Sequence, residues 1–287
     1  MNVFKVGIIG GTGLEDPKIL VNPKELHIDT PYGAPSDFLL EGTIHGVHCV
    51  LLSRHGRKHQ WSPTDLNYRA NIWAMKKAGV SVIIASSASG SLREEIKPGH
   101  VVFLDSFIDR TNKREQSFYD GKEGHPAGVC HIPMHPVFNE KLREILIGSA
   151  KELGIFYHAH GTSVCIEGPR YSTRAESELW RQWGASLVNM TVCPEVVLAK
   201  ELGIPYASVA LSTDYDCWKD THATVSVELV TQIVNENAEK TVKLFMHAAN
   251  KIHEQKQLFL EEIELAKEVA KAAVMDGGHK LNFDYLG

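Results

Sequence analysis

The sequence predicts a single α/β domain that spans residues 1–287. Short apolar runs rich in β-branched residues recur between turn residues, and such runs are typical of strands buried on both faces. Between residues 142 and 211 these runs alternate with longer segments of helical periodicity, which favours a sheet covered by helices. A chain of 287 residues can bury roughly 70–75% of its unfolded surface, so this fold needs no disulfide or metal for stability.

The apolar runs and the helical periodicity place the elements in chain order. Strands are predicted at residues 4–9, 38–44, 49–53, 80–85, 101–104, 162–166, 187–190 and 206–211. Helices are predicted at residues 65–78, 136–153, 174–183 and 194–202, and over much of 225–275 as a long C-terminal helical segment. Thr173 and Glu176 form the sequence pattern of a capping box, which marks the start of the third helix.

Composition excludes several classes of protein. The chain has 30 Lys and Arg against 35 Asp and Glu, a formal charge of −5, so bulk charge gives no reason to expect a nucleic-acid partner. Hydrophobic residues make up 43%, which argues against disorder, and no apolar run approaches the length of a membrane span. The five cysteines form no C-x-x-C pair. We therefore expect a cytoplasmic protein without membrane partners, with the nucleus as a second compatible compartment.

The first segment with chemical character is Gly-Gly-Thr-Gly at residues 10–13, directly after the first predicted strand. Glycines let backbone N–H groups face an anion, and Thr12 adds a hydroxyl. The segment has neither the spacing of a dinucleotide fingerprint nor the lysine of a phosphate loop. Taken alone, it is more often a tight turn without a ligand.

The second segment contains Arg54 and His55 at the end of a predicted strand. Arginine beside histidine and glycine suits recognition of phosphate or carboxylate. His55 and His59 are four residues apart, as in some helical zinc sites, but Gly56 argues against a helix and the usual glutamate is missing. A solvated basic turn is the simplest interpretation, and anion binding is the functional alternative.

Two further groups of polar residues follow predicted strands. Residues 85–91 combine serines with Ala88, and they are interpreted as a strand end that offers donors to a ligand or as a serine-rich loop. Later in the chain, Tyr171 precedes a helix, Thr191 lies at a helix start, and Asp214 and Asp216 follow a strand. Considered one at a time, each of these residues can be interpreted as a helix cap or a turn residue. Their recurrence at strand ends favours a site.

Together these segments resemble the trimeric branch of the purine nucleoside phosphorylase family, in particular its members that act on 5′-methylthioadenosine. The resemblance runs from Val6 to about Glu239. It rests on the motifs at residues 10–13, 54–57, 90–96, 117–121, 130–134, 167–170, 189–191 and 213–216. The resemblance implies a mixed central sheet flanked by helices, and a homotrimer with sites at the subunit interfaces.

The resemblance also implies a set of site residues. Phosphate would be bound by Thr12, Arg54, His55, Ser87, Ala88 and Thr191. The nucleoside would be bound by Tyr171, Asn189, Met190, Asp214, Asp216, Val227, Val230 and His131, the last from a loop that the family donates across its interface. Ser87 stands where members of the family carry threonine, so it keeps the hydroxyl but loses a methyl group that restricts its rotamers.

The implied reaction is phosphorolysis of S-methyl-5′-thioadenosine to adenine and 5-methylthioribose 1-phosphate. Inorganic phosphate is the co-substrate, and no metal or other cofactor is expected. Asp214 is the candidate general acid, because the departing purine needs a proton at N7. Carboxylates at 214 and 216 would accept the 6-amino group of adenine and oppose a 6-oxo group, whereas the 6-oxopurine branch carries asparagine at the first position.

Two alternatives stay open at this point. A 6-oxopurine nucleoside phosphorylase would release hypoxanthine or guanine, and a non-catalytic nucleoside-binding protein would release nothing. Val227 and Val230 lie three residues apart on one helix face. They are interpreted as core packing or, following the resemblance, as the apolar wall of a methylthio pocket.

Overall fold

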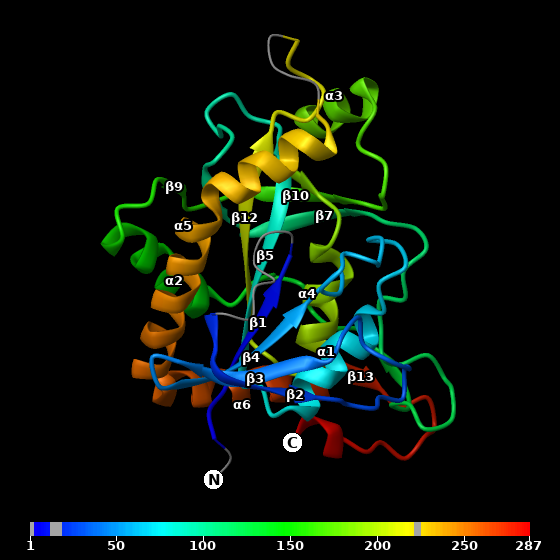
Figure 1. The fold of residues 1–287 in the computed structure, drawn as a ribbon. Helices are drawn as coiled ribbons and strands as arrows, with labels where there is room; N and C mark the ends of the chain where they lie inside the picture. Colours follow the sequence, from blue (N-terminus) through cyan, green and yellow to red (C-terminus); the bar gives the residue numbers. More distant parts are fainter. Residues whose placement is uncertain (1–2, 12–18, 221–224) are drawn as a thin grey trace.

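A computed structural model describes residues 3–11, 19–220 and 225–287 of the chain. A twisted sheet runs through the middle of the molecule, with α2 (Glu140–Glu152) and α5 (Val227–Glu254) on one side and α1 (Tyr68–Lys77) and α4 (Val192–Glu201) on the other (Figure 1). The C-terminal α6 (Lys256–Ala272) lies below the sheet in this view, and α3 (Arg174–Gln182) lies near the top. The predicted α/β class is therefore confirmed.

Within the described residues the main sheet follows the order β2-β3-β4-β1-β5-β11-β10-β7, with β12, β6 and β9 joined to it through β5. The strands are β1 (Val6–Gly10), β2 (Val21–Leu26), β3 (Leu39–Ile44), β4 (Val47–Ser53), β5 (Val82–Ser91), β6 (Val101–Phe103), β7 (Ser106–Arg110), β9 (Tyr157–His158), β10 (Thr162–Ile166), β11 (Leu187–Asn189) and β12 (Tyr206–Asp214). A separate small sheet pairs β8 (Val129–Cys130) with β13 (Val274–Met275).

Strand directions make this a mixed sheet. β1 is parallel to both β4 and β5, and β12 is parallel to β5, whereas β11 runs antiparallel to β5. The parallel strands β4, β5 and β12 all end at the same edge. Their carboxyl ends therefore gather polar residues at one place.

Successive side chains of a strand point to opposite faces of the sheet. Because helices cover both faces here, the central strands are buried on both. Ile9 and Leu52 pack with α1 and α4 in one core cluster, while their neighbours Ile8 and Leu51 pack with α2 and α5 in another. All four side chains are at most 1% exposed. This explains why continuous apolar runs, and not alternating ones, predicted these strands.

Side-chain caps fix where several helices begin. Asn67, Asn139 and Ser226 each accept a hydrogen bond from a backbone N–H in the first turn of the helix that follows. The capping box of Thr173 and Glu176 is present at α3 with both of its hydrogen bonds, which confirms that prediction. No helix in the described ranges is long and apolar enough to cross a membrane.

The structure corrects three element boundaries. β5 continues through Ser91, so residues 85–91 form a strand paired with β12 and not a serine-rich loop. β12 likewise continues to Asp214, beyond the apolar run that predicted it. The C-terminal helical segment is two helices, because Gln255 at φ −103° and ψ 21° interrupts it.

Candidate active site

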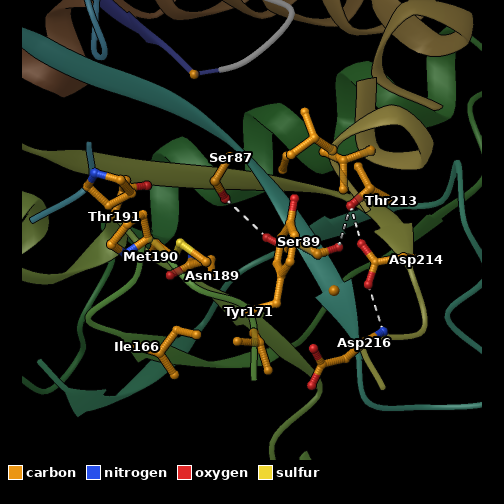
Figure 2. Close-up of a pocket in the computed structure, with 18 of the residues that line it drawn as sticks. Ser87, Ser89, Ile166, Tyr171, Asn189, Met190, Thr191, Thr213, Asp214 and Asp216 are labelled. Atoms are coloured by element: carbon orange, nitrogen blue, oxygen red, sulfur yellow. Dashed lines mark hydrogen bonds between the residues drawn. The ribbon is translucent and has the colours of Figure 1, made fainter. Parts of the chain in front are cut away.

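A cavity of about 560 Å³ opens where the carboxyl ends of β4, β5 and β12 meet β11 and the first turn of α5 (Figure 2). Every described residue predicted for phosphate lines it, namely Arg54, His55, Ser87, Ala88 and Thr191. So do most of those predicted for the nucleoside, namely Tyr171, Asn189, Met190, Asp214, Asp216, Val227 and Val230. Thr12 lies outside the described residues, and His131 does not line the cavity.

The wall of the cavity formed by β5 carries small hydroxyl residues. The Ser87 and Ser89 hydroxyl oxygens lie 3.3 Å apart, as Figure 2 shows, and Ser86 Oγ accepts a hydrogen bond from Gly11 N at 3.1 Å. That bond ties Gly11, the residue directly after β1, to β5. Hydroxyl groups of β5 and the backbone of Gly11 thereby line the same cavity, as anion binding requires.

Arg54 is buried at this end and already has a partner. It is 2% exposed, and its Nε and Nη2 each donate to one oxygen of Glu195 at 2.7 Å. Nη1 donates to the backbone oxygen of Ser86, also at 2.7 Å. Arg54 was predicted from the sequence as a phosphate ligand, whereas the carboxylate that occupies one edge of its guanidinium was not predicted.

His55 lies next to Arg54 and is held in one tautomer. Its Nδ1 is 2.9 Å from the backbone oxygen of Trp61, and because a carbonyl only accepts, Nδ1 carries the proton. Burial lowers the pKa of His55 to about 4, so the ring is neutral near pH 7 and Nε2 is an acceptor. The ring stacks on His59 with centroids 4.5 Å apart, in a turn and not on a helix.

His55→Asn tests this neutral state through the pH dependence of stability. The pKa of His55 is lower in the folded than in the unfolded chain, so between about pH 6.5 and pH 4 the unfolded chain binds an extra proton. The free energy of unfolding therefore decreases as the pH is lowered through this range. From pH 7.5 to pH 5 the parent protein should lose about 2 kcal/mol more than the variant, whose amide can still donate to Trp61. Urea unfolding at both pH values measures the difference, and equal losses would mean that folding does not lower the pKa of His55.

Two carboxylates occupy the opposite end of the cavity. Asp214 is 2% exposed, and its oxygens accept from Thr213 Oγ1 and from the backbone N–H of Asp216, both at 2.7 Å (Figure 2). Burial, together with the nearby charge of Asp214, raises the pKa of Asp216. Gly90 allows this arrangement, because a Cβ there would lie 3.0 Å from Asp214 Oδ1.

Asn189 lies between the two ends with both polar side-chain atoms unused. It is 3% exposed, and neither its Oδ1 nor its Nδ2 makes a hydrogen bond in the described part of the chain. A buried amide without partners is costly, so a ligand that both donates and accepts is the natural partner. Paired hydroxyl groups of a sugar fit that requirement.

The third side of the cavity is apolar. Val230 and Thr231 line it from α5, and Val227 at the start of the same helix is 66% exposed. Ile166 at the end of β10 and Met190 directly after β11 also line the cavity. The cavity therefore offers an anion end, a carboxylate end, a central amide and an apolar side that opens to solvent at Val227.

Arg114 supports this wall from outside the cavity. Its Nη1 donates to the backbone oxygens of Met190 (2.5 Å) and Cys193 (2.7 Å), and its Nη2 donates to that of Glu167 (2.7 Å). Neither Arg114 nor Glu195 was predicted, because nothing in the sequence shows which buried charges meet. Further residues line the cavity without having been predicted as ligand-binding, namely Gly11, His59, Pro63, Ser89, Gly90, Ile166, Pro169, Ser172, Val188, Thr213 and Thr231.

Comparison with known proteins places the chain in a family. A family model described as the phosphorylase superfamily matches residues 5–249. The S-methyl-5′-thioadenosine phosphorylase of Caenorhabditis briggsae is 55% identical over 95% of this chain and 95% of its own length. The chain belongs to the methylthioadenosine phosphorylase family. The Drosophila melanogaster member is 54% identical over 95% of this chain and 94% of its own length.

Solved structures of the methylthioadenosine phosphorylase family have the same fold. The Schistosoma mansoni enzyme in complex with adenine superposes with a TM-score of 0.92 at 39% identity, covering 95% of this chain and 99% of that one. Its complex with tubercidin gives a TM-score of 0.89 at 38% identity, with the same coverage. The expected mixed sheet flanked by helices is thus confirmed by the fold and by its relatives.

His131 is the one described residue of the predicted site that lies elsewhere. It directly follows β8 and is exposed, and its backbone N–H donates to Ala273 O at 2.9 Å, next to β13. It therefore lies outside the cavity of its own chain. That this loop reaches a neighbouring subunit stays a prediction.

Proposed function

We propose that the chain catalyses the phosphorolysis of S-methyl-5′-thioadenosine, giving adenine and 5-methylthioribose 1-phosphate. The observation that carries this proposal is one cavity with buried anion donors around Arg54 at one end and the buried Asp214 at the other. An anionic nucleophile and a purine leaving group need those two ends in one site. Relatives named for this activity, 54–56% identical to the chain, support the same conclusion.

Phosphate needs positioning more than activation, because it is already an anion. The free N–H groups of Arg54, the Ser87 hydroxyl and the segment that begins α4 at Thr191 would hold it beside C1′ of the ribose. As the bond from C1′ to N9 lengthens, the sugar gains positive charge, which the phosphate stabilises. A phosphate oxygen then bonds to C1′, and the electron pair of the broken bond stays on the purine.

The leaving purine acquires that electron pair and is stabilised by a proton at N7. Asp214 is the proposed donor, since it is the more deeply buried of the two carboxyl groups at the base end, 2% exposed against 6% for Asp216. Its hydrogen bonds from Thr213 and from the N–H of Asp216 fix its orientation. Once adenine leaves, solvent restores the proton, so the enzyme returns to its starting state.

Base selectivity follows from the same carboxylates. The Asp214 oxygen that carries no proton, and the carboxylate of Asp216, can accept a hydrogen bond from the 6-amino group of adenine. A 6-oxo group would face these acceptors with another acceptor and leave both sides unpaired. We therefore propose 6-aminopurine nucleosides as the substrate class. The roles given to Arg54, Ser87, Thr191 and Asp214 belong to this proposal.

Val227→His is expected to weaken the use of methylthioadenosine and to improve that of adenosine relative to it. An imidazole at this apolar edge can bond a 5′-hydroxyl but crowds a methylthio group, whose burial contributes on the order of 1–3 kcal/mol. The ratio of kcat/KM values for the two nucleosides should shift about tenfold. Val227→Ala controls for simple loss of packing, and an unchanged ratio for the His variant would mean that the 5′ end binds elsewhere.

We also propose that the protein is a homotrimer in which the loop at His131 completes a neighbouring cavity. Val227 leaves the apolar side of the cavity exposed in a single chain, and His131 lies outside it. Light scattering should give three times the mass of the chain, and a stable, fully active monomer would contradict the assembly.

Inorganic phosphate is the proposed co-substrate, and the proposed reaction calls on no metal or other cofactor. Phosphate is itself the nucleophile, so no side chain has to form a covalent intermediate. The five cysteines are all free, which supports the proposal of a reducing, cytoplasmic location.

A side-by-side assay of methylthioadenosine, adenosine and inosine tests the substrate class. With phosphate present we expect adenine from the first two nucleosides, and hypoxanthine from inosine at a rate at least about 100-fold lower. Preferred release of hypoxanthine would instead indicate a 6-oxopurine nucleoside phosphorylase. Tight binding of all three without any product would indicate a non-catalytic binding protein.

A further inference from the structure

We propose that Glu195 is a positioning residue for phosphate: it orients the guanidinium of Arg54 toward the cavity while staying outside the cavity itself, and Tyr206 holds Glu195 in place. This inference rests on the proposed function only in naming inorganic phosphate as the anion. Its geometric basis is a buried cluster of three side chains, namely Arg54 directly after β4, Glu195 on α4 and Tyr206 at the start of β12.

The hydrogen bonds of Arg54 leave a defined edge for a ligand. A guanidinium has five N–H groups. Among the described residues, three of them donate to Glu195 Oε1, to Glu195 Oε2 and to Ser86 O, which leaves two for a ligand. The free groups are on Nη1 and Nη2. Nη1 lies close to Gly11, which lines the cavity: a Cβ atom added to Gly11 would be only 2.8 Å from Nη1.

Glu195 is itself held rigidly. It is 1% exposed, lies in the first turn of α4 after Pro194, and accepts the hydroxyl of Tyr206 on Oε1 at 2.7 Å. Burial raises the pKa of Tyr206 well above its usual value, so the phenol stays protonated and keeps donating. Burial and the Tyr206 hydrogen bond at Oε1 fix the carboxylate, and its two parallel hydrogen bonds with Nε and Nη2 then fix the plane of the guanidinium.

The ion pair also changes how the site attracts an anion. Arg54 and Glu195 together are neutral, and the described cavity lining holds no other arginine and no lysine. His55 is neutral near pH 7 because of its lowered pKa. Oriented hydrogen-bond donors therefore contribute more to phosphate binding than net charge does. The orientation of the Arg54 guanidinium then controls the affinity of the site for phosphate.

Glu195→Asp tests the geometry while keeping the charge. The shorter side chain cannot reach both nitrogens of Arg54 and the hydroxyl of Tyr206 at once. We expect the KM for phosphate to rise about tenfold or more, with the KM for methylthioadenosine changed less than about twofold. Tyr206→Phe leaves the ion pair and removes only the hydroxyl, so it should raise the KM for phosphate about threefold.

Glu201→Gln is the matched control on the same helix. Glu201 is also 1% exposed, but it accepts from Ser117 Oγ and Phe118 N, both at 2.8 Å, and does not line the cavity. This variant should lower the melting temperature without changing the KM for phosphate. A purely structural role for Glu195 would make its variants behave in the same way.

Calorimetric titration of the intact protein with inorganic phosphate, without nucleoside, separates this inference from the proposed function. Glu195→Asp should raise the Kd for phosphate about tenfold even if methylthioadenosine is not the substrate, in which case only the function fails. Wild-type Kd values in both Glu195→Asp and Tyr206→Phe would overturn the inference and leave the function standing. Equal rises in the KM of both substrates would overturn it as well, and Tyr206→Phe alone decides if Glu195→Asp does not fold.

Discussion

Replacing Asp214 with Asn should lower kcat/KM for methylthioadenosine about 100-fold or more, the usual scale for a lost general acid. The amide keeps the size of the carboxyl and its place at the end of β12, but it has no proton to give to N7. It can, however, donate to a 6-oxo group, so inosine should lose less activity or gain some. Asp216 would still oppose the oxo group, and a complete switch of substrate is not expected.

The ratio of kcat/KM for methylthioadenosine to that for inosine is the quantity to measure. Each nucleoside serves as the control for the other, because a folding defect lowers both rates equally. A lower ratio supports the assignment of Asp214 to the purine. Near wild-type activity with an unchanged ratio would make Asp214 a structural turn residue, and the acid would then be Asp216 or water.

Arg54→Met should destabilise the fold by about 3–5 kcal/mol and raise the KM for phosphate about 100-fold. The loss of stability arises because Glu195, 1% exposed, would remain as a buried charge without its partner. The loss of affinity arises because the two free N–H groups disappear with the guanidinium. Chemical denaturation and steady-state kinetics at varied phosphate measure the two effects separately.

Combining Arg54→Met with Glu195→Gln separates the effect on stability from the effect on phosphate affinity. The neutral amide removes the uncompensated charge and can still accept the Tyr206 hydroxyl, so part of the stability should return. Phosphate affinity should not return, because no guanidinium is present. A single Arg54→Met variant as stable as the parent would contradict the buried ion pair as the source of the effect.

The apolar pattern of the sequence predicted the central strands well because they are buried on both faces. It could not predict β2 (Val21–Leu26), an edge strand that is almost wholly exposed and contains Pro23. It also left open whether residues 85–91 form a loop, since serine and glycine have low strand propensity. In the structure these small residues continue β5, where Gly90 leaves room for Asp214.

In the site, too, features that depend on local sequence were predicted, and contacts between residues distant in the sequence were not. The residues that line the cavity follow strand ends or helix starts, and the family resemblance identified their chemistry. Glu195 is separated from Arg54 by 141 positions, so no local pattern links the two. The sequence predicted Arg54 as a phosphate ligand, whereas the folded chain also uses three of its five N–H groups to hold the arginine in place.

The phosphate requirement of adenine release tests the central claim most directly. With purified protein and methylthioadenosine, the account predicts no turnover in phosphate-free buffer, full turnover with phosphate or arsenate, and one methylthioribose 1-phosphate per adenine when phosphate is supplied. The anion donors gathered around Arg54 would then serve the nucleophile. Comparable adenine release without phosphate, with free methylthioribose as the second product, would show a hydrolytic nucleosidase and contradict the account.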